Sequence, residues 1–191
     1  MSEKKICSWV NLKNPLYVKY HDEEWGVPVK RDQKLFEMLI LEGAQAGLSW
    51  ETVLNKRAHY KKVFHNFNVK KCAELKDKEF EKILLDPGII RNRLKVFSVR
   101  TNAIALLAVK AEFGSFSKYI WSFTEGEVIQ NNWKNIKNVP AKTELSDFIS
   151  KDLKKRGFKF IGSTIVYAYL QGIGVVNDHT TDCYRYEELN N

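Results

Sequence analysis

The sequence has little of what marks membrane-spanning, secreted or disulfide-rich proteins. No apolar run is both long enough and free enough of charge to span a bilayer, which excludes a transmembrane segment. The first nine residues, MSEKKICSW, lack the apolar core of a signal peptide. The three cysteines, Cys7, Cys72 and Cys183, are too few for a disulfide framework in 191 residues, so they are expected to be free thiols or metal ligands. We therefore expect a cytoplasmic protein without a membrane partner.

The residues that are abundant indicate a globular protein with a polyanionic partner. Hydrophobic residues make up 44% of the chain and aromatic residues 13%, which suffices for one sizeable core or two small packed lobes. The formal net charge of +8 favours nucleic acid over a membrane, because no single expected helix is both strongly basic and isolated. Many soluble proteins are basic without such a partner, so the charge alone does not decide.

Helical periodicity dominates the chain. Apolar residues recur at helical spacing, without convincing strand pairs or repeats, so we expect an all-α fold. Side chains that cap helix N-termini precede the expected helices, namely Asn14, Asp32, Ser49, Asn68, Asp77 and either Ser115 or Ser117. The helix from Asp32 should end near Ala46 or Gly47, and another should run from Ile89 to about Glu112 before Gly114.

The C-terminal third carries three further expectations. Residues 124–142 have weak periodicity and should form a surface loop that Trp133 anchors. Residues 143–156 predict a basic amphipathic helix ending at Gly157, with an inner face of Leu145, Phe148, Ile149 and Leu153. Residues 163–171 are almost wholly apolar, which predicts a helix in the centre of the core.

The stretch 35–50, LFEMLILEGAQAGLSW, places a carboxyl group in an apolar helical stripe. Glu42 follows Leu39 by three residues and Met38 by four, so it shares their face. A carboxyl group there must be hydrogen-bonded, paired, or kept neutral by a raised pKa. Small residues follow it, and then Leu48 and Trp50. The pattern indicates one wall of a pocket, although a buried Glu is often only the structural partner of an Arg or a helix N-terminus.

Both ends of the chain carry residues that bind metals. Cys7 and His21 lie near the N-terminus, and His179-x3-Cys183 lies near the C-terminus with a spacing that lets both side chains reach one ion. Two Cys and two His would complete a closed, structural zinc site, which leaves no open position for metal catalysis. The alternative is a buried thiol with ordinary surface histidines. We expect His59 and His65 to be solvated and Cys72 to lie in the core.

A basic helical hairpin is expected around residues 83–93. Asp86-Pro87-Gly88 is a tight-turn signal, and Arg91, Arg93 and Lys95 follow it. Backbone N–H groups at a helix N-terminus, together with these cations, suit a phosphate group. Helical hairpins are common, so this pattern alone does not identify a nucleic-acid site.

A set of motifs rich in uncommon residues runs through the chain. The motifs are Cys7-Ser8-Trp9, Tyr17-x-x-Tyr20-His21-Asp22-x-Glu24-Trp25-Gly26-x-Pro28, Leu35-Phe36-Glu37-Met38, Leu41-Glu42-Gly43-x-Gln45-Ala46-Gly47-Leu48-Ser49-Trp50, Gly88-Ile89-Ile90-Arg91-x-Arg93, Lys154-Lys155-Arg156-Gly157-Phe158-Lys159-Phe160-x-Gly162 and Asn177-Asp178-His179. Together they resemble the 3-methyladenine DNA glycosylase I family. Only the stretch 124–142 contributes nothing to the resemblance.

The resemblance implies a helix-hairpin-helix DNA glycosylase fold whose N- and C-terminal segments are tied together by a zinc site. Residues 1–191 would form a single domain of two packed helical lobes. The terminal segments would make the zinc-bound lobe, and residues 69–123 or thereabouts would carry the helix-hairpin-helix. One structural Zn²⁺ per chain is expected.

Site residues carry over by position from the same resemblance. The zinc ligands would be Cys7, His21, His179 and Cys183. Glu42 and Tyr20 would be the catalytic pair that makes polar contacts with the base, Trp50 would stack on it, and Trp9, Tyr17 and Trp25 would complete an aromatic wall. Gly47 and Leu48 would approach the gap left by a flipped nucleotide, and Gly88, Arg91 and Arg93 would contact DNA.

The implied function is base-excision repair of alkylated, double-stranded DNA by a monomer. The lesion, N3-methyladenine, is a cationic purine that would be flipped out and released as free 3-methyladenine, leaving an abasic site. Glu42 is expected to recognise the base rather than activate water, and Asp147 and Asp152 are expected at exposed helix positions. No lysine lies in an apolar setting that would lower its pKa, so no lyase activity is expected. The alternative is a non-catalytic, zinc-stapled module that binds alkylated or distorted DNA.

Overall fold

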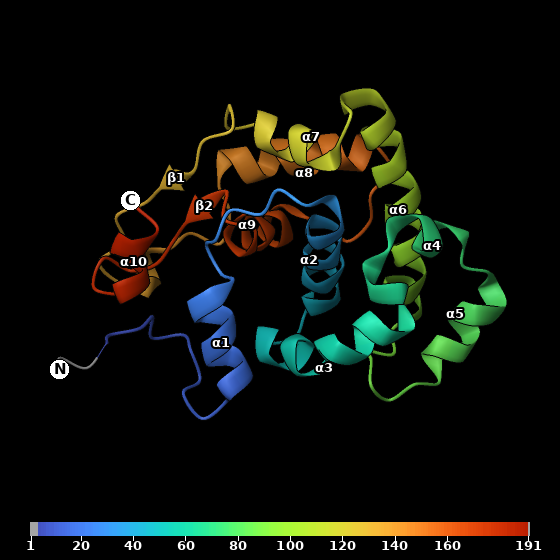
Figure 1. Cartoon of the computed structure of the whole chain (residues 1–191), viewed down its shortest axis with the longest axis horizontal. Helices are drawn as coiled ribbons and strands as arrows, with labels where there is room; N and C mark the ends of the chain where they lie inside the picture. The colour runs from blue at the N-terminus through green and yellow to red at the C-terminus, as the bar shows by residue number, and fades with distance from the viewer. Residues whose placement is uncertain (1–3, 191) are drawn as a thin grey trace.

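The computed structural model describes residues 4–190, and the regular structure in this range is almost wholly helical (Figure 1). The elements in chain order are α1 (Pro15–Glu23), α2 (Asp32–Gln45), α3 (Trp50–Val63), the 3₁₀ turn η1 (His65–Phe67), α4 (Val69–Glu74), α5 (Asp77–Leu84), α6 (Arg93–Phe113), α7 (Phe116–Ser122), β1 (Ile129–Gln130), the 3₁₀ turn η2 (Ile136–Asn138), α8 (Glu144–Lys155), α9 (Ser163–Gly172), β2 (Val176–Asn177) and α10 (Tyr184–Glu188). The predicted all-α character of the fold is confirmed. Within residues 4–190 no helix has the length and apolar character needed to cross a membrane.

Polar side chains start the helices where the sequence predicts them in four cases. Asn14, Ser49, Asn68 and Ser115 each accept a hydrogen bond from a backbone N–H in the first turn of the helix that follows. Such a bond satisfies one of the N–H groups that a helix leaves unpaired at its N-terminus. At the other end of α6, Gly114 has a φ of +84°, which suits glycine, and ends the helix as expected.

Two predicted caps are displaced by one residue. Asp32 and Asp77 are the first residues of α2 and α5 rather than their caps. The Asp32 carboxylate instead accepts a hydrogen bond from the backbone N–H of Ser117 at 2.9 Å and pairs with Lys110 at 3.5 Å. Its tertiary partners on α6 and α7 therefore replace the local capping bond that the sequence pattern predicts.

Helix α6 begins at Arg93, after the cap Asn92, and not at Ile89 as predicted. The backbone N–H of Ile89 donates to the Asp86 carbonyl, and that of Ile90 donates to the Tyr60 hydroxyl at 3.2 Å. Ile89 is buried, so its apolar character reflects packing of an extended turn and not a helical stripe.

Phe148 does not lie on the inner face of α8, contrary to the prediction. Its side chain is 61% exposed and meets only the edge of the Phe123 ring. The buried face of α8 carries Ser146, Ile149, Ser150 and Leu153. Small serines occupy half of the inner face, which a search for apolar residues alone overlooks.

The short parallel strand pair β1–β2 and the helix α10 were not predicted. β1 pairs with β2 through Ile129–Val176 and Gln130–Asn177. This pairing fixes the start of the 124–142 stretch against the chain that leads into α10. The Trp133 indole N–H donates to the Asp178 carboxylate at 2.7 Å, so the predicted anchor is confirmed.

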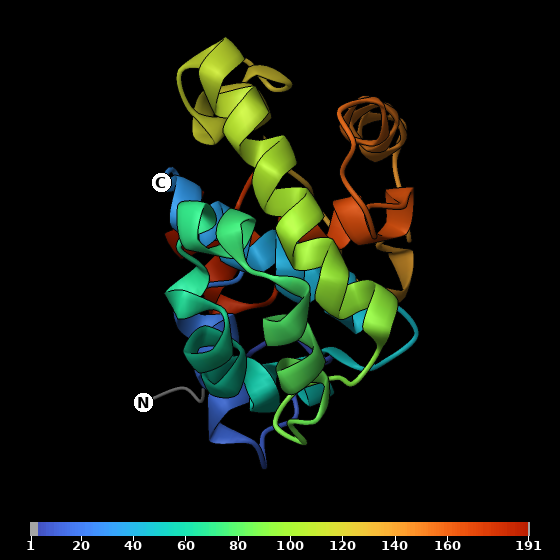
Figure 2. The same cartoon turned by 90° about the vertical axis from the view of Figure 1, so that its right-hand side faces the viewer.

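The core forms around α2 and α9. Every residue of α2 from Leu35 to Ala44 is buried, and α9 packs against it. Figure 1 shows both helices in the middle of the molecule, with α4, α5 and α6 on one side and β1, β2 and α10 on the other. Figure 2 shows α6 running obliquely along the outside with α4 and α5 beside it. The predicted central place of residues 163–171 is confirmed for Val166, Tyr169 and Leu170.

The segment between α1 and α2 lies against the C-terminal end of α9. The backbone N–H groups of Gly26 and Val29 donate to carbonyl oxygens of Gln171 and Ile173 at 3.0 and 2.9 Å. Gly174 has a φ of +71°, and a Cβ atom on it would lie 2.3 Å from the Val27 carbonyl carbon. This close approach of two backbones brings the aromatic N-terminal residues over the end of the central helices.

Candidate active site and metal centre

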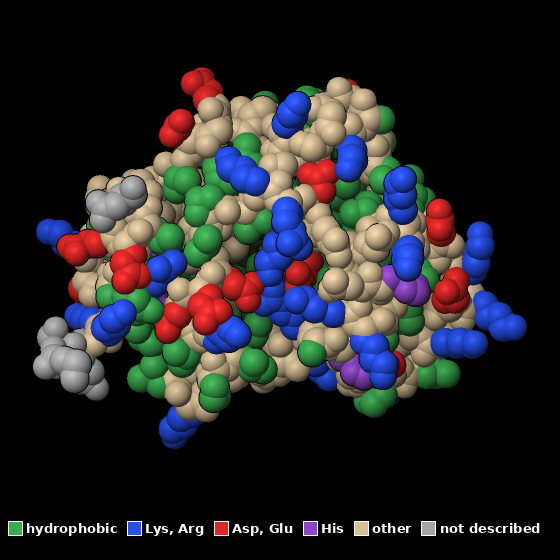
Figure 3. Space-filling view, viewed as in Figure 1, with side chains coloured by type: hydrophobic (Ala, Val, Ile, Leu, Met, Phe, Trp, Pro, Cys, Tyr) green, Lys and Arg blue, Asp and Glu red, His purple; other side chains and the backbone are tan. Residues whose placement is uncertain are grey.

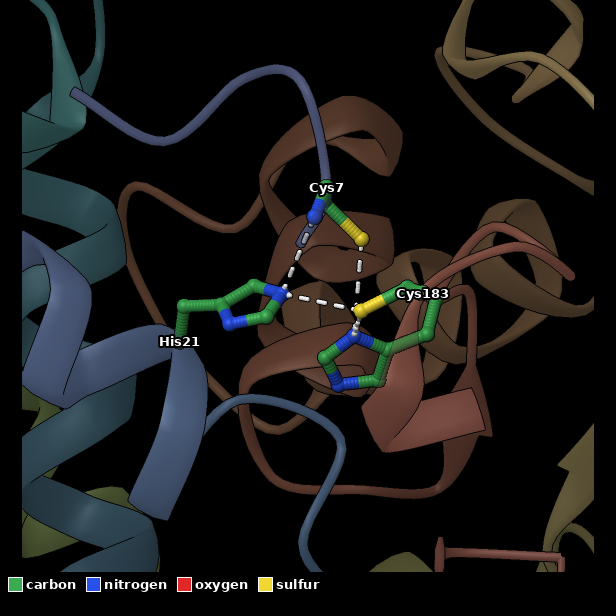
Figure 4. A group of neighbouring side chains, drawn as sticks. Cys7, His21 and Cys183 are labelled. Carbon is green, nitrogen blue, oxygen red and sulfur yellow. Dashed lines mark hydrogen bonds between the residues drawn. The ribbon is translucent and has the colours of Figure 1, made fainter. Parts of the chain in front are cut away.

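The predicted metal ligands converge at one point. Cys7 comes from the N-terminal segment, His21 from α1, His179 from the loop after β2, and Cys183 from the residue before α10. Their sulfur and ring nitrogen atoms all lie within 4.8 Å of one another, and all four side chains are buried. Figure 4 shows Cys7, His21 and Cys183 pointing toward one another from separate parts of the chain. The burial of both histidines excludes the alternative of ordinary surface histidines.

Distances within this cluster match a tetrahedral metal site. Cys183 Sγ lies 3.4 Å from His21 Nε2 and 3.6 Å from His179 Nδ1, and Cys7 Sγ lies 3.5 Å from His179 Nδ1. Tetrahedral ligands at usual zinc distances are about 3.3 to 3.8 Å apart. The hydrogen bond with Cys7, and then those with the two histidines, lower the pKa of the Cys183 thiol, which favours the thiolate that binds metals. These three distances and the donor set therefore fit a metal ion.

The second nitrogen of each histidine ring is also held. His21 Nδ1 lies 2.7 Å from the Asp22 carboxylate, and His179 Nε2 lies 3.1 Å from the Trp25 carbonyl oxygen. Outer partners of this kind fix the tautomer and the orientation of a ligating imidazole. They leave the inner nitrogens as the ones that face the sulfur atoms.

A cavity of about 370 Å³ opens beside the metal cluster, between α1, α2, α3, α9 and the segment 136–141. Its lining residues are Trp9, Tyr17, Tyr20, Trp25, Glu42, Gln45, Trp50, Ile136, Val139, Pro140, Ala141, Thr164, Tyr167, Ala168 and Gln171. All six residues predicted to bind a base are in this set. Cavities of this size hold small, drug-sized ligands.

Aromatic side chains pack against one another around the cavity. The Trp9 ring lies 5.3 Å from that of Tyr17 and 4.8 Å from that of Trp25, and the rings of Tyr20 and Trp50 are 5.1 Å apart. Trp9 and Trp25 also contact the two histidines of the candidate metal cluster edge-on, at ring distances of 5.4 and 4.6 Å. The metal cluster and the cavity thus share a wall.

Glu42 is the acidic residue of the cavity lining, and it is nearly fully buried at 3% exposure. Among residues 4–190 it has no hydrogen-bond or ion-pair partner, and burial raises its pKa to about 8. Burial, and next the charge of Glu42, also raise the pKa of Tyr20, so its hydroxyl stays protonated. Of the three states that the sequence allows for Glu42, the structure selects a neutral carboxyl without a partner.

A structural Arg partner for Glu42 is excluded because the nearby buried guanidinium is committed elsewhere. Arg57 Nε donates to Glu37 at 2.7 Å, and both terminal nitrogens donate to Glu24 at 2.8 and 2.7 Å. Lys34 also pairs with Glu24, at 2.6 Å. This network joins the end of α1 to α2 and α3 and leaves Glu42 alone in the cavity.

The corner between α2 and α3 is exposed but well held. Gly47 has a φ of +79° with open space around it, and Leu48 is exposed. Lys95 Nζ donates to the carbonyl oxygens of Ala44 and Ala46 at 2.8 and 2.6 Å. Burial lowers the pKa of Lys95, so the prediction that no lysine has such a setting is wrong. Its ammonium is nevertheless occupied in capping the end of α2.

The turn between α5 and α6 is fastened to α3. A Cβ atom on Gly88 would lie 2.4 Å from the His59 ring, so this position requires glycine. His59 Nε2 lies 2.6 Å from the Asp86 carboxylate, which also accepts the Gly88 N–H at 2.8 Å. Lys56 donates to the Pro87 carbonyl at 2.8 Å. The prediction of a merely solvated His59 is therefore wrong.

The two arginines of this turn differ in their surroundings. Arg93 pairs with Glu81 at 2.6 Å, whereas the exposed Arg91 has no partner within the described range. On the face seen in Figure 3, Lys and Arg side chains are spread over the molecule with acidic side chains among them. The turn is therefore a candidate DNA contact because of its local geometry and not because a basic patch surrounds it.

The remaining predicted positions lie outside the cavity. His65 is exposed and Cys72 is buried, both as expected. Asp147 and Asp152 are only partly exposed, and Asp152 accepts hydrogen bonds from Tyr119 and Arg156 at 2.7 Å each. Neither aspartate lines the cavity.

Several cavity residues were missed from the sequence. Thr164, Tyr167, Ala168 and Gln171 lie on one face of α9 at intervals of three and four residues. The threonine and glutamine at that spacing could have indicated that this face meets a cavity. Gln45 and the segment 136–141 carry no comparable signal.

The sequence matches the family described as Methyladenine glycosylase over residues 9–186. DNA-3-methyladenine glycosylase 1 of Escherichia coli (strain K12) is 45% identical over 180 residues, covering 94% of this chain and 96% of that protein. The crystal structure of a 3-methyladenine DNA glycosylase I has a TM-score of 0.91 and 46% identity, covering 94% of this chain and 98% of the other. The Staphylococcus aureus enzyme, whose structure describes 3-methyladenine recognition, has a TM-score of 0.88 and 33% identity over 90% and 92% of the two chains.

Proposed function

The chain belongs to the methyladenine glycosylase family, and on this premise we propose that it flips N3-methyladenine out of alkylated double-stranded DNA and hydrolyses its N-glycosidic bond. The products are free 3-methyladenine and an abasic site. The observation that carries the proposal is Glu42, a buried carboxyl group without a partner in a cavity walled by aromatic rings.

Recognition of the base rests on its positive charge. A flat cation is attracted to aromatic faces by roughly 0.5 to 2 kcal/mol for each ring, which suits Trp50 as a stacking platform and Trp9, Tyr17 and Trp25 as the surrounding wall. Undamaged adenine is neutral and gains none of this attraction. Its glycosidic bond is also stronger, because a neutral purine is a poorer leaving group than a methylated, cationic one.

Glu42 and Tyr20 supply the polar contacts. In the empty cavity Glu42 is neutral below a pH of about 8. A cationic base beside it favours the carboxylate, so binding lowers the pKa of Glu42 and releases its proton. The carboxylate then accepts hydrogen bonds from the base and offsets its charge, and charge-assisted bonds contribute about 1.5 to 3 kcal/mol. Tyr20, whose hydroxyl stays protonated, serves as a donor.

The chemistry needs little help from acids or bases of the protein. The methylated base is already a good leaving group, and no second carboxylate is among the lining residues given above. We assign Glu42 to recognition, with water as the nucleophile. The ammonium of Lys95 is committed to backbone carbonyl groups, which supports hydrolysis without Schiff-base strand cleavage.

DNA would be held by two exposed turns. Gly47 and Leu48, at the corner after α2, would enter the gap left by the flipped nucleotide. The α5–turn–α6 unit would act as the helix-hairpin-helix, with Gly88 giving close backbone approach and Arg91 and Arg93 facing phosphates. Phosphate contacts position the protein without reading sequence, which suits an enzyme that must find a lesion anywhere.

The metal is proposed to be one structural Zn²⁺ held by Cys7, His21, His179 and Cys183. Two thiolates and two imidazoles are a common zinc ligand set. When bound, the ion supplies a crosslink between the chain ends and no reaction chemistry, because all four positions are filled. Reduced thiols also suit a cytoplasmic location, and we propose that the protein acts there as a monomer.

Incubation with methylated double-stranded DNA tests the proposed function. Chromatography should detect free 3-methyladenine, with strands left intact until the abasic sites are cleaved by alkali. The Glu42→Gln variant, which keeps the size of the side chain, should release the base at least about tenfold more slowly. Binding of methylated DNA without any base release would instead identify a non-catalytic binding module.

A further inference from the structure

Asp178 is a buried carboxylate that accepts four hydrogen bonds. One oxygen accepts from Asn131 Nδ2 and Trp133 Nε1, both at 2.7 Å. The other accepts from the Tyr167 hydroxyl at 2.6 Å and Gln171 Nε2 at 2.7 Å. Asp178 is fully buried and does not line the cavity, so it would not touch a bound base.

The donors come from two parts of the chain that line the cavity or lead into its lining. Tyr167 and Gln171 lie on the face of α9 that lines it. Asn131 and Trp133 lie just before Ile136, Val139, Pro140 and Ala141, which also line it. The Asp178 carboxylate is therefore the point at which both parts are joined.

Apart from the packing of Val139 against the core, the contacts given between the 131–141 segment and other parts of the chain lie at its start. Its start is fixed by the β1–β2 pair, by a bond from the Thr181 N–H to the Trp133 carbonyl at 2.9 Å, and by the Tyr186 hydroxyl bound to Asn132. None of these reaches α9. Burial, and then the bond to Asp178, raise the pKa of Tyr167, which keeps its hydroxyl a donor.

We propose that Asp178 is a positioning residue of the base pocket, which sets the spacing between the α9 wall and the 136–141 wall. This inference rests on the proposed function, because it assumes that 3-methyladenine occupies the cavity. A flat ligand loses contact with one wall when the walls move apart, so its affinity depends on this spacing. The 124–142 stretch thereby contributes to specificity despite its featureless sequence.

An Asp178→Asn variant tests the proposal. An amide can accept on only one side, so it opposes two of the four donors with an N–H group. The inhibition constant of free 3-methyladenine should rise at least about fivefold, and KM for methylated DNA should rise more than kcat falls. The affinity for unmethylated DNA should not change, because the DNA-contacting turns lie elsewhere.

Two further variants separate positioning from general destabilisation. Asp152→Asn is the matched control, since its carboxylate also accepts from a tyrosine hydroxyl but lies outside the cavity lining. It should lower thermal stability without changing the inhibition constant. Trp133→Phe removes one donor to Asp178 from a residue that does not line the cavity, and it should weaken 3-methyladenine binding in the same direction.

The outcomes distinguish this inference from the proposed function. If the wild-type protein does not bind 3-methyladenine, the proposed function fails. If the wild-type protein binds it and both Asp178→Asn and Trp133→Phe retain the parental inhibition constant, only the positioning role fails. Should Asp178→Asn not fold, Trp133→Phe decides by the same measurement. Zinc content, measured alongside, should equal that of the wild type in every folded variant.

Discussion

Glu42 lies in the proposed base site, and its burial lowers the stability of the folded protein at alkaline pH. Burial raises its pKa from the usual 4.5 to about 8. The folded protein therefore binds one more proton than the unfolded chain between these two pH values. Stability that is present below pH 4.5 is lost as pH rises through about 8, by at most about 4 to 5 kcal/mol. A buried, unpaired carboxyl group is retained where a ligand rather than the fold needs it.

Replacement of this carboxyl group should stabilise the free protein at alkaline pH. Glu42→Gln cannot ionise, so its midpoint of thermal unfolding should match that of the wild type near pH 4.5 and exceed it above pH 8. Thermal denaturation across this range, followed by circular dichroism, measures the difference. The exposed Glu144→Gln is the control and should show no such pH dependence. Equal midpoints of Glu42→Gln and wild type at pH 9 would mean that Glu42 is not desolvated.

Individual site residues could be predicted where a side chain is chemically out of place in its local sequence. Glu42 could be singled out because an acid in an apolar stripe demands an explanation. The four candidate metal ligands could be singled out from the sequence, but the alternative of a buried thiol and surface histidines stayed open, because the spacing of Cys7 and His21 has no pattern. Asp178 could not be identified as a junction, since its four donors lie up to 47 residues away in two separate segments.

At the scale of elements, the α5–turn–α6 unit owes its shape to α3. Lys56 and His59 fasten the turn, and Gly88 leaves room for the His59 ring. The turn is therefore pre-organised, so little conformational entropy would be lost on binding DNA at the site proposed above. Residues 89–92, which follow Gly88, are not helical.

Two arginines two residues apart in the sequence, Arg91 and Arg93, give a paired test of phosphate contact. Arg91→Ala should weaken DNA binding equally for all sequences and lower the slope of log affinity against log salt by about one. Arg93→Ala should have a smaller effect, because its charge is already offset by Glu81. Fluorescence anisotropy of labelled duplexes at several salt concentrations measures both slopes. An unchanged slope for Arg91→Ala would remove this residue from the DNA interface.

Helices were predicted well because their start signals are local. Asn14, Ser49, Asn68 and Ser115 cap through hydrogen bonds to residues two or three positions later, which a sequence displays directly. The displaced cap at Asp32 and the missed strand β1 have the opposite cause. Their conformations depend on partners more than 40 residues away, such as Ser117 and Val176, and no local pattern encodes these.

At the scale of the whole molecule, the metal cluster closes the chain into a loop. Cys7 and His179 meet across 172 positions, and Trp25 links the cluster to the cavity wall through its carbonyl oxygen and its ring. Loss of the metal should therefore affect the cavity as well as the ends of the chain. The core around α2 and α9 is packed separately from the cluster, so we expect it to be less affected.

Removal of the metal gives a direct test at this scale. Elemental analysis should find one zinc per chain, and a strong chelator should lower the unfolding temperature and expose the segment before α1 to protease. Cys183→Ala should behave like the chelated protein. Cys72→Ala, which alters a core thiol outside the cluster, should keep its zinc. A fully folded, protease-resistant protein without metal would exclude the proposed structural crosslink between the chain ends.

The distance along the chain between Cys7 and its partners also determines when the cluster can form during synthesis. At roughly 5 to 20 residues per second, the ribosome makes His179 about 10 to 35 seconds after Cys7. Until then the N-terminal aromatics Trp9, Tyr17 and Trp25 have neither the metal cluster nor α9 to pack against. The cavity is consequently completed only after α9 has been made, and a chain truncated before α9 lacks part of its lining.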